Sequence, residues 1–192
     1  MTFVSNPTIA VVGAGASGVI ATAALLRSLR RPARVLLFDG RGSRGAGLAY
    51  GTSDPDHVLN VPASKMSAIA EEPDHFVQWL REDGREQAAA WRVSAVPDAF
   101  VPRGLYAAYL EDVLRTSLER SDPGVVLEIL SEEISDLVRR AGGWRLLGRS
   151  GACPFSIIRL RCQACSKRRR PVASRDAQTH PTPAPLAISI PA

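Results

Sequence analysis

The sequence lacks any apolar run close to the roughly 18 to 20 residues that a membrane-spanning helix needs. Its first residues also lack the basic, apolar and cleavage regions of a signal peptide. The chain has 192 residues and is 45% hydrophobic, which is enough to bury the core of one full domain, or of one domain and a fragment. These features together predict a soluble, cytoplasmic protein.

Cysteine is absent from the first 150 residues, because all three cysteines lie between residues 151 and 192. That segment also contains six of the 14 prolines, seven Lys or Arg residues and one acid. Its net charge is therefore +6, and since the whole chain carries +5, residues 1–150 carry −1. The composition predicts a folded domain over residues 1–150 and a basic, proline-rich tail over residues 151–192 that is disordered or aberrant.

The basic charge of the tail suggests a nucleic-acid partner. However, Phe155 is the only aromatic residue of the tail, so the tail offers little aromatic surface on which bases could stack. A Cys-x-x-Cys pair at residues 162–165 suggests zinc. However, Cys153 and His180 are too irregularly spaced to complete a set of four ligands. We therefore expect neither a nucleic-acid partner nor a bound metal.

The N-terminal part of the chain contains a strand, a glycine loop, a helix and a second strand in succession. The β-branched run Thr8–Val12 predicts a buried strand, and it leads directly into Gly-Ala-Gly-Ala-Ser-Gly at residues 13–18. Residues 19–30, rich in Ala and Leu, predict a helix, and residues 34–38 predict a second apolar strand that Asp39 closes. A lone G-x-G-x-x-G is common by chance, but this one leaves a strand, opens a helix and has an acid 21 residues after its last glycine.

Each residue of such a unit has a physical task. Gly13 permits a tight turn, Gly15 lets the backbone approach a pyrophosphate, and Gly18 lets the helix pack closely on the strand. The free N–H groups of the first helical turn favour phosphate, and the Asp39 carboxylate can accept hydrogen bonds from a ribose 2′-OH. The residues predicted to bind a cofactor here are Gly13, Ala14, Gly15, Ala16, Ser17, Gly18 and Asp39. The alternative is a glycine turn between strand and helix that binds no ligand.

Two other glycine motifs fail on inspection. Gly13 and Gly18 have the spacing of a P-loop, but valine and isoleucine follow where Lys and Ser or Thr must hold phosphate and magnesium. The Ser17 position does not fit the G-x-S-x-G nucleophile elbow, because valine stands where its second glycine belongs. Neither a P-loop nucleotidase nor an α/β-hydrolase is supported.

The middle of the chain carries several further motifs. A glycine-rich loop at residues 40–51 runs into Gly-Leu-Ala-Tyr-Gly-Thr at residues 47–52. Leu-Asn-Val-Pro-Ala follows at residues 59–63, and Phe-Val-Pro-Arg-Gly-Leu-Tyr at residues 100–106. Together with the N-terminal unit, these motifs resemble the flavoprotein-type FAD/NAD(P)-binding family from residue 8 to about residue 115.

The resemblance implies an α/β, Rossmann-like three-layer fold, incomplete in this chain, with inserted helices and a small β-meander. It also implies that the glycine fingerprint binds the ADP part of FAD, with Asp39 on the adenosine ribose, and that NAD(P)H is a possible co-substrate. The positions expected to line the flavin side are Gly45, Gly47, Tyr50, Asn60 and Arg103. In such enzymes the flavin performs the redox chemistry, so no side chain need be a catalytic acid or nucleophile.

The remaining elements are predicted from periodicity and turn residues. A helix should begin at Pro73 and end at Gly84, and an apolar stripe over residues 105–118 predicts another. Short strands are predicted over residues 125–129, 134–139 and 144–147, with a hairpin turn at residues 141–143 and a further possible strand at residues 155–160.

The family pattern would next supply an acid, an apolar strand and an Ala-Thr-Gly turn, which the sequence after Gly151 does not contain. We therefore expect the native reading to end near this residue and the tail to be frameshifted or otherwise aberrant. The rival interpretation is a genuine basic tail.

Three functions are compatible with these residues. The leading hypothesis is the FAD-binding portion of an NAD(P)-linked flavoprotein oxidoreductase. The second is an NAD(P)-binding Rossmann module in which Arg41 and Arg44 face a 2′-phosphate, although Asp39 disfavours one. The third is a truncated, non-catalytic nucleotide-binding protein. Whether the chain is itself an enzyme stays open, as do its substrate, its reaction direction and its oligomeric state.

Overall fold

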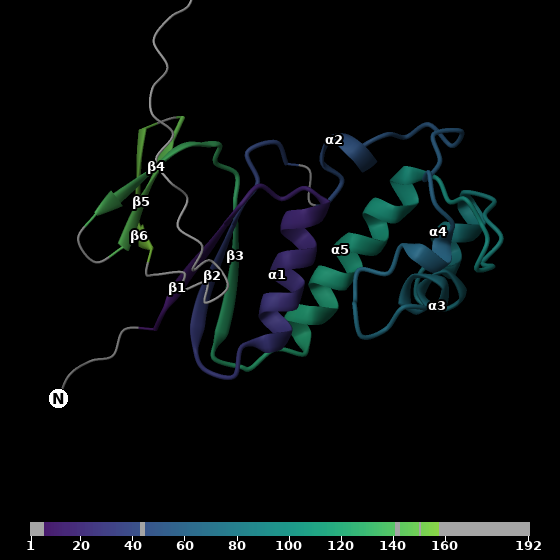
Figure 1. Ribbon diagram of the computed structural model, residues 1–192, viewed down its shortest axis with the longest axis horizontal. Helices are drawn as coiled ribbons and strands as arrows, with labels where there is room; N and C mark the ends of the chain where they lie inside the picture. The colour runs from purple at the N-terminus through teal and green to yellow at the C-terminus, as the bar shows by residue number, and fades with distance from the viewer. Residues whose placement is uncertain (1–5, 43–44, 141–142, 150, 158–192) are drawn as a thin grey trace, which may run out of the picture. The chain divides into compact units, whose positions relative to one another are not determined.

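The computed structural model describes residues 6–42, 45–140, 143–149 and 151–157. All of them lie in one compact unit, Met1–Leu160 (Figure 1). None of the helices in these ranges is long and apolar enough to cross a membrane. The tail was predicted over residues 151–192, and its first residues, 151–157, form a strand. Residues 158–192, with the cysteine pair, and Arg44 lie outside the described residues.

A parallel sheet of three strands forms the centre of this unit. Its strands are β1 (Thr8–Val12), β2 (Ala33–Phe38) and β3 (Val125–Leu130), in the order β1-β2-β3. The central strand β2 is nearly all buried, as expected for a strand that is paired on both sides and covered on both faces. The arrangement confirms the predicted α/β, Rossmann-like fold.

Helices fill the two crossover connections of the sheet. The first strand continues into α1 (Ala16–Ser28), and a long insertion between β2 and β3 ends with α5 (Arg103–Glu119). The other elements of the insertion are α2 (Gly47–Tyr50), the 3-10 turn Ala63–Lys65, α3 (His75–Arg81) and α4 (Arg85–Ala90).

The helix predicted over residues 73–84 is shorter than expected, and α4 was not predicted. The chain after α3 packs closely on Trp79 at Gly84. A side chain at this position would collide with the Trp79 ring, because an added Cβ would lie 2.5 Å from the nearest ring atom. In α4 only Ala88 is buried, so this helix shows no apolar periodicity in its sequence.

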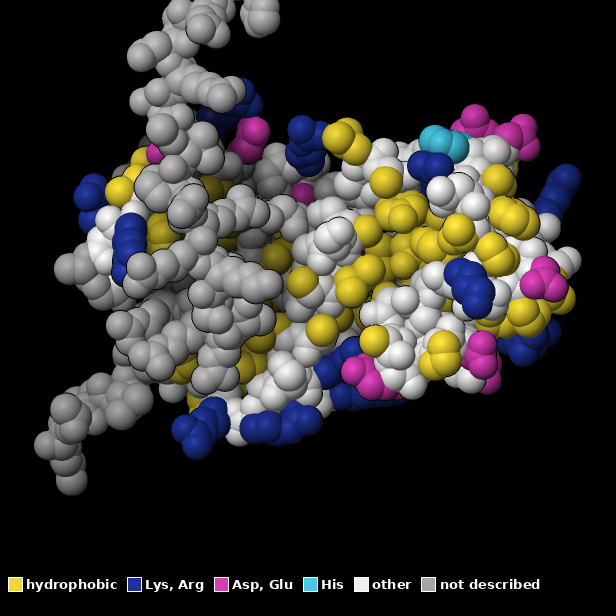
Figure 2. All heavy atoms as spheres, viewed as in Figure 1, with side chains coloured by type: hydrophobic (Ala, Val, Ile, Leu, Met, Phe, Trp, Pro, Cys, Tyr) yellow, Lys and Arg dark blue, Asp and Glu magenta, His cyan; other side chains and the backbone are white. Residues whose placement is uncertain are grey.

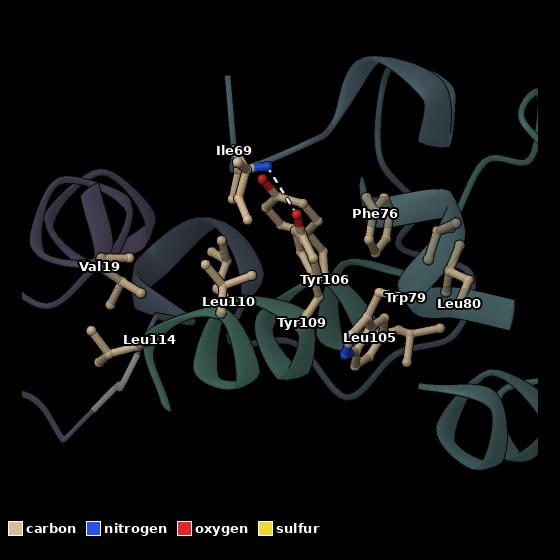
Figure 3. Packing of buried hydrophobic residues seen from close by; sticks show 14 of the residues in the cluster. Val19, Ile69, Phe76, Trp79, Leu80, Leu105, Tyr106, Tyr109, Leu110 and Leu114 are labelled. Carbon is tan, nitrogen blue, oxygen red and sulfur yellow. Dashed lines mark hydrogen bonds between the residues drawn. The ribbon is translucent and has the colours of Figure 1, made fainter. Parts of the chain in front are cut away.

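The larger core joins α1, α3 and α5 (Figure 3). Val19 of α1 lies against the face of α5 that carries Leu110 and Leu114. Further along α5, Tyr106 and Tyr109 join the rings of α3 in an aromatic cluster. The ring centroids of Phe76 lie 4.7 Å from Tyr109, 5.2 Å from Tyr106 and 6.2 Å from Trp79. Such tilted and edge-to-face pairs stabilise a core beyond simple burial.

One hydroxyl group ties this cluster to the loop before α3. The Tyr109 hydroxyl accepts a hydrogen bond from the Ala68 N–H at 3.0 Å and lies 2.9 Å from Nδ1 of His75. Burial raises the pKa of Tyr109, and burial lowers the pKa of His75, so both are neutral near pH 7. The tautomer of His75 decides which of the two neutral groups donates in this contact.

A small antiparallel sheet covers the other face of the parallel sheet. It consists of β4 (Ile134–Arg140), β5 (Gly143–Gly148) and β6 (Gly151–Ile157), in that order. Leu146 of β5 is buried with Leu36 and Phe38, while the alternate residues of β2 face the helices. Residues 125–130 extend the parallel sheet, so the inserted meander begins only at β4.

Replacing Tyr109 with Phe should cost about 1–3 kcal/mol in the free energy of unfolding, because the buried Ala68 N–H loses its acceptor. Urea denaturation measures this. Tyr106→Phe is the matched control, since the described residues provide no hydrogen-bond partner for that hydroxyl. An equal loss in both variants would contradict the assigned role of Tyr109.

The free energy of unfolding should also decrease as the pH falls, because His75 is partly buried in its neutral form. Its pKa in the folded state lies below the ordinary 6.5, so the unfolded chain binds more protons below that pH. The contribution of neutral His75 is therefore fully present above pH 6.5 and is lost as pH falls through the folded pKa. His75→Asn should flatten the dependence of the unfolding free energy on pH between 7.5 and 5, and urea denaturation at several pH values measures this.

Candidate functional site

The loop between β1 and α1 requires glycine at two positions. Gly13 has φ +96°, in the left-handed region, and its N–H donates to the Phe38 carbonyl oxygen at 3.0 Å. At Gly18 an added Cβ would overlap the carbonyl oxygen of Gly13. The loop can therefore turn from strand to helix in this short span only without those side chains.

The N-terminus of α1 presents unpaired backbone donors. The first hydrogen bond within the helix is from the Val19 N–H to the Gly15 carbonyl at 3.0 Å, so the N–H groups of residues 16–18 have no acceptor inside the helix. Gly15 is the N-cap and has no side chain to bond them, and the first turn contains no acid. These donors and the helix dipole favour an anion.

The glycine-rich loop after β2 returns to this point. Gly45 has φ +100°, and its N–H donates to the Ala14 carbonyl at 2.7 Å. Gly47 has φ +51°, and a Cβ added to it would lie 3.2 Å from the Gly15 Cα. Two glycine backbones therefore meet at the start of α1, and their lack of side chains leaves the adjoining space open.

A cavity of about 250 Å³ begins at this meeting point. This volume is below the roughly 300–1,000 Å³ of a site for a whole drug-sized ligand, so it suits one part of a dinucleotide. The lining residues come from β1, the glycine loops, the end of β2 and the connection between β3 and β4. They are Val12, Gly13, Ala14, Gly15, Phe38, Asp39, Gly40, Arg41, Gly47, Leu48, Glu132, Glu133 and Ile134.

Asp39 is one of the residues that line this cavity. It is 3% exposed, and its backbone N–H donates to the Leu130 carbonyl of β3 at 2.8 Å. Its own carbonyl accepts from the Gly42 N–H at 3.2 Å. The end of β2 is thus held on β3, which fixes the position of the carboxylate-bearing residue.

The connection between β3 and β4 forms a wall that the sequence interpretation missed. Gly40 packs directly on it, because an added Cβ would lie 2.7 Å from the Glu133 Cα. Glu133 is paired with Arg149 at 2.8 Å. The sequence could have indicated this wall, because the carboxyl ends of parallel strands lie at one edge of a sheet and the residues after β3 must therefore lie beside those after β1 and β2.

The cavity lining brings together only some of the predicted residues: Gly13, Ala14, Gly15, Asp39 and Gly47. Residues 16–18 form the first turn of α1 beside it. The Tyr50 ring packs against Tyr106 with centroids 4.9 Å apart, and Asn60 is exposed. Arg103 donates to the carbonyls of Val58 at 3.0 Å and Ala49 at 3.3 Å, so its guanidinium ties two parts of the insertion together.

Other kinds of site receive less support from the described part of the chain. It contains no group of three or more His, Cys, Asp or Glu side chains placed to hold a metal. On the face seen in Figure 2, several Lys and Arg side chains follow the lower margin and others lie within the face, beside a broad area of apolar side chains.

A glycine cradle with unpaired N–H groups, followed by a cavity with a buried acid, has the chemistry of a dinucleotide-binding site. A family model described as FAD-NAD(P)-binding matches residues 10–157, and the chain belongs to this family. None of the curated proteins compared with the chain matches it.

Several solved structures are similar to this chain over part of their own length. A flavin monooxygenase from Stenotrophomonas maltophilia is 18% identical, with a TM-score of 0.45 over 76% of this chain and 34% of that protein. Glycine oxidase from Geobacillus kaustophilus is 17% identical, with a TM-score of 0.39 over 78% of this chain and 52% of the oxidase. The p-nitrophenol 4-monooxygenase from Pseudomonas putida is 17% identical, with a TM-score of 0.38 over 77% and 38% of the two chains. The chain thus spans between a third and about half of the length of these proteins.

Gly15 and Gly18, at the start of α1, should respond differently to replacement by alanine. Gly18→Ala should cost about 1–3 kcal/mol or more in the free energy of unfolding, because its Cβ overlaps backbone. Gly15→Ala should be neutral or stabilise the fold by about 0.4–1 kcal/mol, since Gly15 has φ −71° and its nearest neighbour lies 4.0 Å away. Chemical denaturation compares them, and equal effects would contradict the loop geometry.

Proposed function

We propose that this chain binds the ADP part of FAD and forms the FAD-binding portion of an NAD(P)-linked flavoprotein oxidoreductase. The observation that carries the proposal is the meeting of Gly15 and Gly47 at the start of α1, beside a cavity that is lined by buried Asp39. An oxidoreductase activity of the whole protein is part of the proposal, because the chain covers 34% of the flavin monooxygenase.

The pyrophosphate would lie at the N-terminus of α1. The N–H groups of residues 16–18 would donate to its oxygens, and the absence of an acid in the first turn avoids repulsion. The backbone at Gly15 and Gly47 would allow phosphate oxygens to approach more closely than any side chain would permit.

The adenosine would occupy the cavity. The Asp39 carboxylate would accept hydrogen bonds from the ribose hydroxyls. Val12 is 54% exposed and Leu48 88% exposed, although both are apolar and line the cavity. An adenine base lying over Val12 and Leu48 would remove this apolar surface from water, which would explain why the two side chains are exposed.

A bound flavin would supply the hydride chemistry, and the side chains of this chain would bind and orient it. Tyr50, Asn60 and Arg103 are proposed to lie toward the flavin end. Arg103 would act there by holding the carbonyls of Val58 and Ala49 in place. Its replacement would then loosen the insertion around the flavin without removing a cofactor contact.

A second candidate is an NAD(P)-binding module that uses the same cavity. It is favoured by one observation, the presence of exposed Arg41 in the lining, where a guanidinium could pair with a 2′-phosphate. Parallel titrations with FAD, NADH and NADPH separate the two candidates, since the proposal requires FAD to bind most tightly.

The full 192-residue chain should quench FAD fluorescence on titration, and Gly15→Asp should weaken binding by at least about 100-fold. Aspartate is a favoured N-cap residue and the position has room, so the variant should fold. Its carboxylate would bond the same N–H groups that the pyrophosphate needs and would repel it.

Ala21→Asp is the matched control, because it adds the same charge on an exposed position of α1. Thermal unfolding with FAD provides a second readout, since ligand at 100 times its dissociation constant stabilises a protein by about 2.7 kcal/mol. A wild-type chain that takes up no FAD, or a Gly15→Asp chain that binds it normally, would refute the proposal.

A further inference from the structure

A second cavity, of about 370 Å³, shares no lining residue with the cavity at the glycine loops. Its volume falls within the roughly 300–1,000 Å³ of sites that bind small molecules. It lies where the turn over residues 52–57 meets the end of α4. Its lining residues are Ser53, Pro55, Ala90, Trp91 and Arg92. The proposed function assigns no role to any of them.

The backbone of Arg92 adopts a conformation that is unfavourable for an arginine. Among the described residues, it is the only residue other than glycine with a positive φ, at +55°. Its N–H donates to the Ala89 carbonyl at 3.0 Å, and the Val93 N–H donates to the Ala88 carbonyl at 2.9 Å. These bonds form the usual helix ending in which glycine is the preferred residue at the position of Arg92. An arginine there is less favourable for the fold than glycine would be, so its side chain is the feature to explain.

The guanidinium of Arg92 is exposed and lines the cavity. The described part of the chain provides no hydrogen bond or ion pair to it. Asp54, beside Ser53, does not line the cavity, and its carboxylate accepts the Asp56 N–H at 3.0 Å. The cavity therefore contains one cation whose charge no lining residue balances.

The indole ring of Trp91 is held beside this cation by a glycine. A Cβ added to Gly104, at the start of α5, would lie 2.8 Å from Cη2 of Trp91 and 2.6 Å from the Thr52 carbonyl oxygen. The ring thus packs over bare backbone, where a side chain would displace it. Trp91 is only half-buried, so it contributes to the cavity as well as to the core.

These lining groups match a particular ligand chemistry. A guanidinium binds a carboxylate through two parallel hydrogen bonds, and its single charge balances that of a carboxylate. A phosphomonoester carries about −1.5 to −2 charges at pH 7, which one guanidinium does not balance. The indole ring offers a surface on which a flat ring can stack, and the Ser53 hydroxyl is a further hydrogen-bonding group.

We infer that this cavity binds a small aromatic carboxylate, with the carboxylate on the Arg92 guanidinium and the ring on the Trp91 indole. The inference is independent of the proposed function, because the two cavities have no lining residue in common. It also accounts for an arginine at a position where the backbone favours glycine.

The test is a titration of the full chain with benzoate, followed by the NMR signals of the indole N–H groups. The chain has three tryptophans, and the indole N–H of Trp79 is bonded to Asp112 at 2.9 Å, so its signal should not move. The Trp91 signal, assigned from its loss in Trp91→Phe, should shift with a dissociation constant of about 1 mM or tighter. Benzamide lacks the charge and acetate lacks the ring, so each should bind at least about tenfold more weakly.

Arg92→Gly and Arg92→Asn remove the guanidinium, and both residue types tolerate a positive φ. Their urea midpoints should therefore equal or exceed that of the wild type, while benzoate affinity falls at least about tenfold. Arg85→Gln is the matched control, because it removes the same charge from an exposed position of α4 outside the cavity. It should retain wild-type affinity for benzoate.

Three results would overturn the inference: no shift of the Trp91 signal at about 20 mM benzoate, benzamide binding as tight as that of benzoate, or undiminished affinity in the Arg92 variants. FAD titration of the same variants keeps the two proposals apart, since FAD affinity should not change. A chain that binds benzoate but no FAD would contradict the proposed function and leave this inference standing.

Discussion

The hydrogen-bonded ladder of β2 is the constraint on which the rest of the structure depends. Because β2 pairs in parallel with β1 on one side and β3 on the other, the carboxyl ends of all three strands lie at one edge of the sheet. The glycine fingerprint leaves β1, Asp39 ends β2, and the Glu132 connection leaves β3 at that same edge. A ligand at this edge therefore meets residues that no local segment of the chain could bring together.

The start of α1 lacks features that usually stabilise a helix N-terminus. The first turn of α1 has neither a side-chain cap nor an acid to complement its dipole, although either would stabilise an ordinary helix. The glycines at positions 13, 45 and 47 adopt left-handed backbone conformations that favour a residue without a side chain. Under the proposed function, an anion bound at the N-terminus of α1 would supply the stabilisation that the missing cap and acid do not.

Local patterns were sufficient for part of this picture. The strand Thr8–Val12, the glycine loop and Asp39 are neighbours in sequence as well as in space, so periodicity and glycine spacing predicted them. Glu132 could not be found in that way, because only the register of β3 on β2 brings it to Asp39. Arg103 was predicted from a resemblance, which does not reveal that its guanidinium bonds to the carbonyls of Val58 and Ala49.

The long insertion between β2 and β3 has a consequence for the order in which the site assembles. The unit of β1, α1 and β2 closes over a short stretch of chain, whereas the pairing of β2 with β3 must wait for residues 39–124 to be brought back. Closing long loops costs entropy and slows folding. The turn between β1 and α1 therefore depends only on nearby residues, whereas the contacts that Gly45 and Gly47 make with it depend on the folding of the insertion, because Gly45 also packs on Leu110 of α5.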